Sequence, residues 1–291
     1  MTQRAFRFGV NLLTPSSRAG WQARCREAED LGYDVIAVPD HLGLPAPFPA
    51  LVSAAEATTR PRLAVFVLNT GFYSPALLAR DLAGTDRLVD GRLEVALGTG
   101  YVKAEFDAAG LPWSGARQRV DHLERTVGEL CRLLTDPGHE PRPVQEPMPP
   151  LAIAGNGDRV LRLAAQRADI VAFSGATSGT NPGSLRFLGP DALGERVAQV
   201  RHAAGERFAD LELNLLLHAV APDGDRRRAA AGARRFEDHR EVSDVPTILS
   251  GPPGAMADTL EQHREKYGFT YFTVPEPAMR DFARAMAKVR S

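Results

Sequence analysis

The sequence predicts a single (β/α)₈ barrel, on three observations. Short apolar runs with the composition of strands alternate with longer segments of helical periodicity. The alternation gives eight strand-then-helix units, which is typical of a parallel sheet with right-handed crossovers. Eight units in 291 residues favour a closed barrel, with a doubly wound open sheet as the alternative. No change in composition marks a second domain, so we expect residues 1–291 to form one domain.

The first half of the chain supplies four of these units. Its strands are uninterrupted apolar runs, as expected for strands buried on both faces. Ser16 and Ser17 can cap the first helix, Gly32 ends it, and Pro75 suits the first turn of a later helix. We predict strands at 6–12, 35–38, 63–68 and 93–97, and helices at 18–31, 50–58, 75–89 and 117–134.

The second half supplies the other four units. The proline-rich segment 136–150 is predicted to be a connecting loop, and the glycine- and serine-rich segment 174–183 is predicted to be another. The charged segment 223–242 is expected to be helical in part. We predict strands at 151–154, 170–173, 211–217 and 271–274, and helices at 159–167, 191–204, 253–267 and 278–289.

Bulk composition argues against several classes of protein. The net charge of −1 gives no general attraction to nucleic acid or to an anionic membrane. Cys25 and Cys131 lie far apart, in predicted helices, and form no CxxC or Cys/His cluster, so we expect two reduced cysteines and no metal site. The sequence has no signal-peptide pattern and no apolar run long enough for a transmembrane helix. We therefore expect a cytoplasmic protein.

Polar and glycine residues follow the predicted strands. Active sites of parallel barrels lie in the loops after the strands. The opposite turns hold mainly Gly, Pro and Asp, so this asymmetry places the site at the C-terminal mouth. The residues at the strand ends are Asn11, Asp40, His41, Asn69, Thr70, Tyr73, Gly98, Thr99, Gly100, Tyr101, Gly155, Asn156, Gly157, Ser174, Gly175, His218 and Glu276.

Two glycine turns suggest how a ligand could approach the backbone. The turn at 98–100 (GTG) lets a flat ligand come close, although a plain tight turn explains it equally well. The stretch 155–157 (GNG) precedes a helix, whose free amides could bind phosphate; the alternative is a helix start capped by Asp158. The two turns do not form GxGxxG, so a Rossmann site is not indicated.

His41 is the best candidate for proton chemistry, because histidine titrates near neutrality and His41 follows Asp40 at a strand end. His218 is a weaker candidate, for which a structural role is the simpler interpretation. No pair of histidines has the spacing of a metal site, and no GxSxG nucleophile motif is present.

Several segments together carry a family resemblance. They are residues 38–41 (VPDH), 73–83 (YSPALLARDLA), 86–101 (DRLVDGRLEVALGTGY), Glu105 with 110–112 (GLP), and 153–157 (IAGNG) with 161–169. In this combination the chain resembles the luciferase-like monooxygenase superfamily, in its F420-dependent branch. The resemblance is strongest over residues 5–175.

The resemblance implies a barrel that is usually a homodimer, with the deazaflavin F420 across the mouth and its ring over strands two to four. The histidine matching His41 often serves in proton transfer, and a non-proline cis peptide is expected near Val65–Phe66. On these grounds we assign cofactor binding to Val65, Phe66, Gly98, Thr99, Gly100, Tyr101, Gly155, Asn156 and Gly157, and contact with a small-molecule substrate to Asn11, Tyr73, Ser174 and His218.

The chain also departs from the family pattern. Tyr101 follows the GTG turn where sugar-phosphate-oxidising members have glutamate, which argues against glucose 6-phosphate as substrate. The third strand ends in 69–73 (NTGFY), without the basic residue and histidine of many members. The insertion after strand seven looks short.

The resulting hypothesis is hydride transfer between C5 of F420 and a small organic substrate, with His41 exchanging the accompanying proton and Asp40 holding His41. The substrate bond would be C=C, C=N or a carbonyl/alcohol pair. One alternative is an FMN-dependent monooxygenase of the same superfamily, and another is a barrel that binds flavin or F420 without turnover. An aldolase would need a lysine at a strand end, and only Lys103 lies near one.

Overall fold

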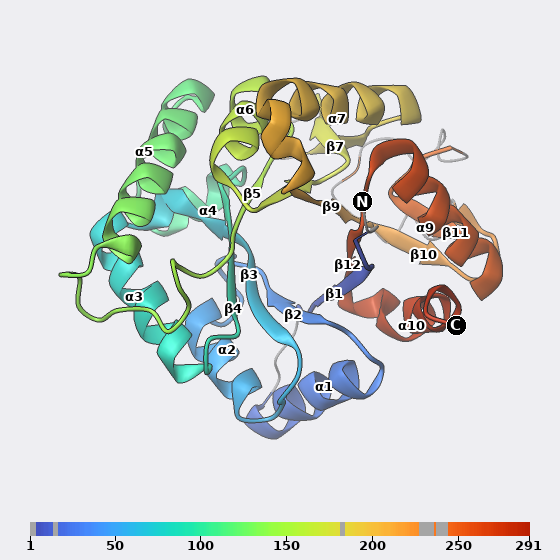
Figure 1. Ribbon diagram of the computed structural model, residues 1–291, viewed down its shortest axis with the longest axis horizontal. Coiled ribbons are helices and arrows are strands. Elements are labelled where there is room, and N and C mark those ends of the chain that lie inside the picture. The colour runs from blue at the N-terminus through green and yellow to red at the C-terminus, as the bar shows by residue number, and fades with distance from the viewer. Residues whose placement is uncertain (1–3, 14–16, 181–183, 227–235, 237–243) are drawn as a thin grey trace.

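The chain folds into a closed barrel of eight parallel strands (Figure 1). This computed structural model describes residues 4–13, 17–180, 184–226, 236 and 244–291. The strand order around the barrel is β1-β12-β9-β6-β5-β4-β3-β2, so the first and last strands pair and close the sheet. The predicted barrel is confirmed and the open sheet is excluded. The barrel strands are β1 (Arg7–Asn11), β2 (Val35–Val38), β3 (Arg62–Asn69), β4 (Leu93–Gly98), β5 (Leu151–Ala154), β6 (Ile170–Phe173), β9 (Glu212–Leu216) and β12 (Tyr271–Pro275).

Helices form a ring outside the strands (Figure 1). The side chain of Ser17 caps the first helix by accepting from the Gly20 amide, and Gly268 ends another helix in the left-handed conformation. None of the helices in the described ranges has the length and apolar character needed to cross a bilayer. The ring consists of α1 (Arg18–Asp30), α2 (Pro47–Ala55), α3 (Pro75–Leu88), α5 (Ala116–Thr135), α6 (Asp158–Arg167), α7 (Pro190–Ala204), α9 (Pro253–Tyr267) and α10 (Met279–Val289).

Several short elements lie outside the barrel, and the sequence analysis did not predict them. The segment 174–183, expected to be a loop, instead contains β7 (Ala176–Ser178), which pairs antiparallel with β8 (Leu185–Phe187). A second small sheet pairs β10 (Ala219–Ala221) with β11 (Ile248–Ser250), and α4 (Lys103–Ala108) follows the GTG turn. Three-residue strands are too short to show a periodicity, so sequence patterns miss them. The remaining elements are the 3₁₀ turns η1 (Thr70–Phe72), η2 (Gly205–Ala209) and η3 (Glu276–Ala278).

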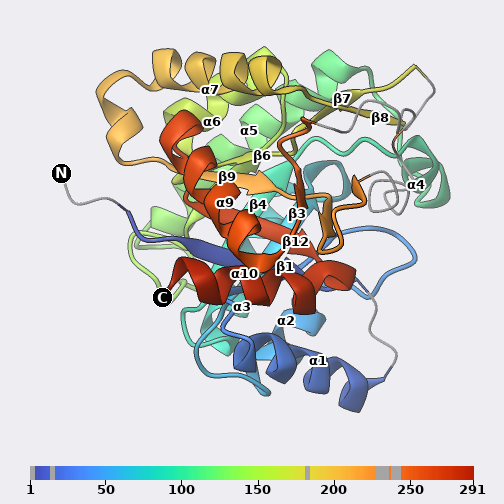
Figure 2. The ribbon, with the colours of Figure 1, turned by 90° about the vertical axis from the view of Figure 1, so that its right-hand side faces the viewer.

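The charged segment 223–242, expected to be partly helical, lies mostly outside the described residues. The helix expected at 50–58 begins earlier, at Pro47, because proline is well suited to the first turn. In Figure 2, α4, β7 and β8 gather at one end of the barrel and both chain termini lie toward the other.

The barrel has two apolar layers. The larger layer lies between the strands and the helices and includes Ile36, Val38 and Val65. The second layer fills the interior, because strand residues alternate between the two faces, and five of its nine members are alanines. Its members are Val35, Ala37, Ala64, Phe66, Ala96, Ala152, Ile170, Ala172 and Tyr271.

A cluster of paired charged side chains fills the end of the barrel where the strands begin. The Arg7 guanidinium pairs with the carboxylates of Glu94 and Glu212, whose side chains are each only 4% exposed. Arg62 Nε lies 2.6 Å from Glu94 Oε1, and the Arg7 guanidinium sits over the Tyr271 ring. Charged side chains and a bulky ring therefore fill this end, which leaves the opposite end, where the strands finish, as the candidate place for a ligand.

Candidate active site at the barrel mouth

His41 lies just past the end of β2 and is paired with a carboxylate. Its Nδ1 is 2.8 Å from Oε1 of Glu105, which projects from α4. The ring of Tyr101 meets the imidazole edge-on, at 6.0 Å between centroids. The side chain of His41 is 26% exposed and that of Glu105 is 13% exposed. This acid–base pair is therefore close to solvent at the mouth yet held in place.

The sequence analysis assigned Asp40, not Glu105, to hold His41, and the structure corrects this. Asp40 Oδ2 accepts from the Asn69 amide at 3.0 Å, and its carboxyl also bonds the hydroxyl of Tyr73. Burial raises the pKa of Asp40, and burial together with the Asp40 carboxyl raises the pKa of Tyr73. Asp40 therefore ties the end of β2 to the end of β3. The sequence analysis named Glu105 only among the segments that carry the family resemblance and assigned it no role. Its position shortly after the GTG turn, at the mouth, is the signal that could have identified it.

The GTG turn is fixed against the end of β3. Gly100 has a φ of 67°, and a Cβ there would lie 2.3 Å from Asn69 Oδ1, so no other residue fits. Thr70 Oγ1 donates to the Gly98 carbonyl at 2.9 Å. The predicted turn beside the third strand is thus a tightly packed feature of the mouth.

Strand β3 carries an irregularity at the mouth. Its register against β4 shifts between Val65 and Leu68, and the non-proline cis peptide lies at Phe66–Val67, one residue after the expected position. Phe66 and Val67 both pack with the interior cluster, whereas the Val65 side chain packs toward the helices. Phe66, rather than Val65, therefore presents its side chain to the barrel interior.

Asn11 at the end of β1 lies next to this irregularity. Its Nδ2 donates to the Phe66 carbonyl at 3.1 Å. Its Oδ1 is buried and has no donor among the described residues. This oxygen could accept a hydrogen bond from a ligand at the mouth.

A second group of predicted residues comes together from β5, β6 and β9. Asn156 Nδ2 donates to Ser174 Oγ and to the Ala176 carbonyl, and His218 Nε2 lies 2.6 Å from the Ser174 carbonyl. Asn156 Oδ1 is buried without a donor among the described residues. Strand β6 lies opposite β2 in the strand order, so this group faces His41 across the mouth.

His218 differs from His41 in its surroundings. Its ring meets the rings of Phe187 and Phe236 edge-on, and those two rings stack on each other at 3.7 Å. Burial lowers the pKa of His218 to about 4, although the hydrogen bond to Ser174 opposes this change. His218 is therefore neutral at physiological pH and donates Nε2–H to Ser174.

These features fit a flat, flavin-type ring. Five alanines give the interior layer an apolar surface with little side-chain bulk, and Asn11 and Asn156 offer buried oxygens without donors among the described residues. Gly155 and Gly157 lead into the first turn of α6, and nothing lies within 4 Å of a Cβ added at Gly157. Among the described residues no group of three His, Cys, Asp or Glu side chains is arranged to hold a metal ion.

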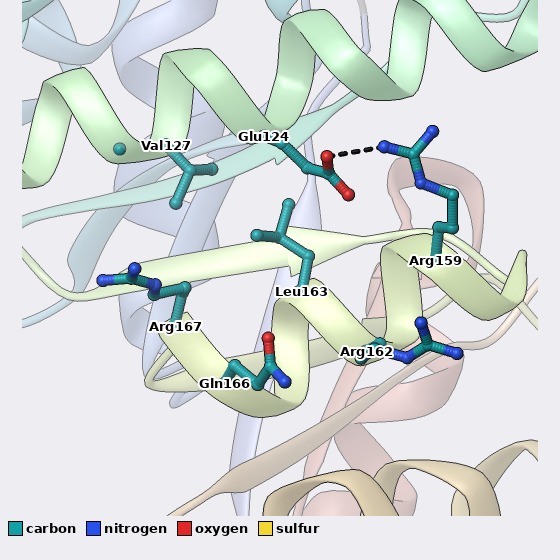
Figure 3. A pocket seen from close by; sticks show the side chains of 8 residues that line it. Glu124, Val127, Arg159, Arg162, Leu163, Gln166 and Arg167 are labelled. Carbon is teal, nitrogen blue, oxygen red and sulfur yellow. Dashed lines mark hydrogen bonds and ion pairs between the residues drawn. The ribbon is translucent and has the colours of Figure 1, made fainter.

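A hollow lies outside the barrel, between α5 and α6 (Figure 3). Figure 3 shows the Glu124–Arg159 ion pair at one side of it. It shares no residue with the mouth and is separate from the candidate site. The hollow is lined by Glu124, Val127, Gly128, Arg159, Arg162, Leu163, Gln166 and Arg167.

The family model of luciferase-like monooxygenases matches residues 5–288. Among solved structures, the chain is similar to the riboflavin lyase RcaE, crystallised with modified FMN and riboflavin, at 14% identity and a TM-score of 0.77, over 99% of this chain and 92% of that one. It is also similar to the coenzyme F420-dependent tetrahydromethanopterin reductase of Methanopyrus kandleri, at 17% identity and a TM-score of 0.76, over 98% and 97%. A third similar structure is an F420-dependent secondary alcohol dehydrogenase in complex with an F420–acetone adduct, at 18% identity and a TM-score of 0.75, over 99% and 100%. At these identities the likenesses show the fold.

Proposed function

The chain belongs to the luciferase-like monooxygenase family, and from that premise we propose that it is an F420-dependent oxidoreductase acting on a small organic substrate. The observation that carries the proposal is the His41–Glu105 pair at the rim of a mouth with a floor of alanines. A site of this kind offers an imidazole, held by a carboxylate, beside an apolar surface. Among the described residues, no group of three His, Cys, Asp or Glu side chains is arranged to hold a metal ion.

The residues that would hold the cofactor come from both sides of the mouth. Phe66, with the turn Gly98, Thr99 and Gly100 and the ring of Tyr101, would contact the deazaflavin, and Asn11 Oδ1 and Asn156 Oδ1 would accept hydrogen bonds from it. Gly155 and Gly157, at the start of α6, would receive its phosphate. When bound, F420 supplies a centre that gives or takes a hydride, and the protein supplies orientation and the proton.

His41 would give or take the proton that accompanies the hydride. Imidazole is suited to this role because it exchanges a proton near neutral pH. Tyr73, Ser174 and the neutral His218 would contact the substrate from the rim. The bond that reacts would be C=C, C=N or a carbonyl/alcohol pair. The likeness to two F420-dependent enzymes supports this cofactor, and the likeness to a structure holding modified FMN makes FMN the alternative to test.

Titration of the purified protein with F420 and, separately, with FMN tests the proposal through the fluorescence of each cofactor. We expect saturable binding of F420 and much weaker binding of FMN. Tight binding of FMN alone would instead assign the enzyme to the oxygen-using branch of the family. Binding of neither would refute the cofactor assignment. Binding of F420 with no turnover across a panel of alcohols, imines and activated alkenes would favour a carrier or sensor.

The family resemblance also supports a homodimer. Light scattering coupled to size-exclusion chromatography should give twice the mass of one chain, and a mass of one chain would contradict this part of the proposal.

A further inference from the structure

Glu105 makes the only hydrogen bond that the described residues offer to the His41 ring. The 2.8 Å distance from Nδ1 to Oε1 is that of a strong, charge-assisted bond. A carboxylate can only accept, so the bonded Nδ1 must carry the proton. The neutral ring then has its unprotonated nitrogen at Nε2.

The helix that carries Glu105, α4, is packed through Phe106 against an aromatic cluster. The neighbouring Phe106 is 3% exposed, and its ring packs against Phe72 and Trp113 at 5.2 and 5.0 Å between centroids. The Arg119 guanidinium lies over the Trp113 ring, 3.9 Å from its centroid. A helix of six residues has little stability of its own, so this packing fixes where α4 presents Glu105.

The other carboxyl group near His41, that of Asp40, is bonded to other partners. Asp40 bonds the Asn69 amide and the Tyr73 hydroxyl, which orient it toward β3. Asp40 interacts with His41 through its charge but makes no hydrogen bond to the ring among the described contacts. Glu105 is therefore the group in position to decide which ring nitrogen carries the proton.

We propose that Glu105 is a positioning residue that holds neutral His41 in its Nδ1–H tautomer, so that Nε2 is the nitrogen that exchanges a proton with the substrate. The catalytic importance of this tautomer rests on the proposed function, but the tautomer itself does not. In other sites where a carboxylate orients a catalytic imidazole, the carboxylate selects the tautomer in the same way. The wrong tautomer would present an N–H where a hydrogen-bond acceptor is required.

The test is the ¹⁵N spectrum of the His41 ring in the full-length protein without added cofactor, above the pH at which imidazole is charged. Nitrogen shifts distinguish the two tautomers, and His41→Gln assigns the signal. We expect the Nδ1–H tautomer in the wild type. In Glu105→Ala we expect the Nε2–H tautomer, which a free imidazole prefers. Asp107→Ala is the matched control, because it removes from the same helix a carboxylate that, in the part of the chain that the structure describes, pairs with exposed Lys103 and not with His41. It should leave the spectrum unchanged.

The wild-type spectrum alone can overturn the proposal, since an Nε2–H tautomer there would contradict it even if Glu105→Ala did not fold. An unchanged tautomer in a folded Glu105→Ala protein would also refute it. In the enzyme loaded with its cofactor, Glu105→Ala should lower kcat by about a hundredfold, the low end of what a positioned acid–base group contributes, and change KM little. A failure of F420 binding would remove the proposed function but leave the tautomer assignment intact, so the two failures are distinguishable.

Discussion

His41 is the single residue on which the proposed proton transfer depends. Replacing it with alanine removes the titratable group but leaves the alanine floor and the glycine turns that would hold the ring. We expect His41→Ala to lower kcat by about 10²- to 10⁴-fold with cofactor affinity changed little. Steady-state kinetics and fluorescence titration measure the two quantities separately. His202→Ala, on the outer helix α7, should change neither, and equal loss of activity in both variants would contradict the assignment.

The second prediction at the scale of a residue concerns His218 and the pH dependence of the free energy of unfolding. Its pKa in the folded protein is about 4, below the ~6.5 of an unfolded chain. The unfolded state therefore binds more protons between these values, and the free energy of unfolding falls as the pH drops through this window. At about pH 5 the cost reaches up to about 2 kcal/mol.

His218→Gln keeps a donor for the Ser174 carbonyl but does not titrate. Thermal unfolding at about pH 7.5 and about pH 5 should show that the variant loses less stability on acidification than the wild type. His202→Gln, on an exposed side chain, serves as the control and should behave as the wild type does. Equal losses in the wild type and in His218→Gln would show that folding does not lower the pKa of His218.

At the scale of elements, α4 depends on the absence of a side chain at Gly71. A Cβ there would lie 2.7 Å from two carbons of the Phe106 ring, and that ring is enclosed by Phe72 and Trp113. Gly71→Ala must therefore displace α4, and with it Glu105. We expect a lower melting temperature and a His41 tautomer like that of Glu105→Ala. Gly84→Ala, in α3 with nothing near the added methyl group, should instead stabilise the protein by roughly 0.4–1 kcal/mol.

The ion cluster at the closed end makes a second prediction at this scale. Arg7→Met leaves the carboxylates of Glu94 and Glu212 buried without their shared partner. Removing one partner of a buried pair costs about 3–5 kcal/mol. We expect a clear fall in the midpoint of thermal unfolding. Arg280→Met, which breaks an exposed pair with Glu27, should leave the midpoint unchanged, and similar midpoints for both variants would show that the buried cluster adds no stability.

The barrel elements could be predicted from the sequence, whereas the short strands outside the barrel could not. The eight barrel strands and the helices between them were predictable because buried strands are continuous apolar runs and surface helices are periodic. Strands β7, β8, β10 and β11 were not, because three residues carry no period. The mouth residues were predictable as strand ends. The partnership of His41 with Glu105 was not, because it joins residues 64 positions apart through a short helix that only tertiary packing stabilises.

At the scale of the whole molecule, the barrel closes by joining the two ends of the chain. Strand β1 pairs with β12, and the last helix, α10, then packs over them. Phe282 of α10 meets the Phe8 ring edge-on at 5.6 Å, and the Tyr33 hydroxyl donates to the Met279 carbonyl at 2.8 Å. Removing α10 would therefore expose apolar residues on β1 as well as losing its own buried side chains.

Truncation after Ala278 tests this closure. Each large apolar side chain of α10 that is buried contributes about 1.5–3 kcal/mol, and a domain has only about 5–15 kcal/mol of net stability. Phe282, Met286 and Met279 are all buried, so we expect the shortened chain to lack a cooperative thermal transition and to aggregate. Truncation after Val289 keeps the helix and removes Ser291 and Arg290, whose guanidinium bonds Asp34 and Gly32 and lies over the Phe8 ring, so it should fold with a slightly lower melting temperature. If the chain ending at Ala278 melted cooperatively near the wild-type temperature, closure of the barrel would not depend on the helix that covers its seam.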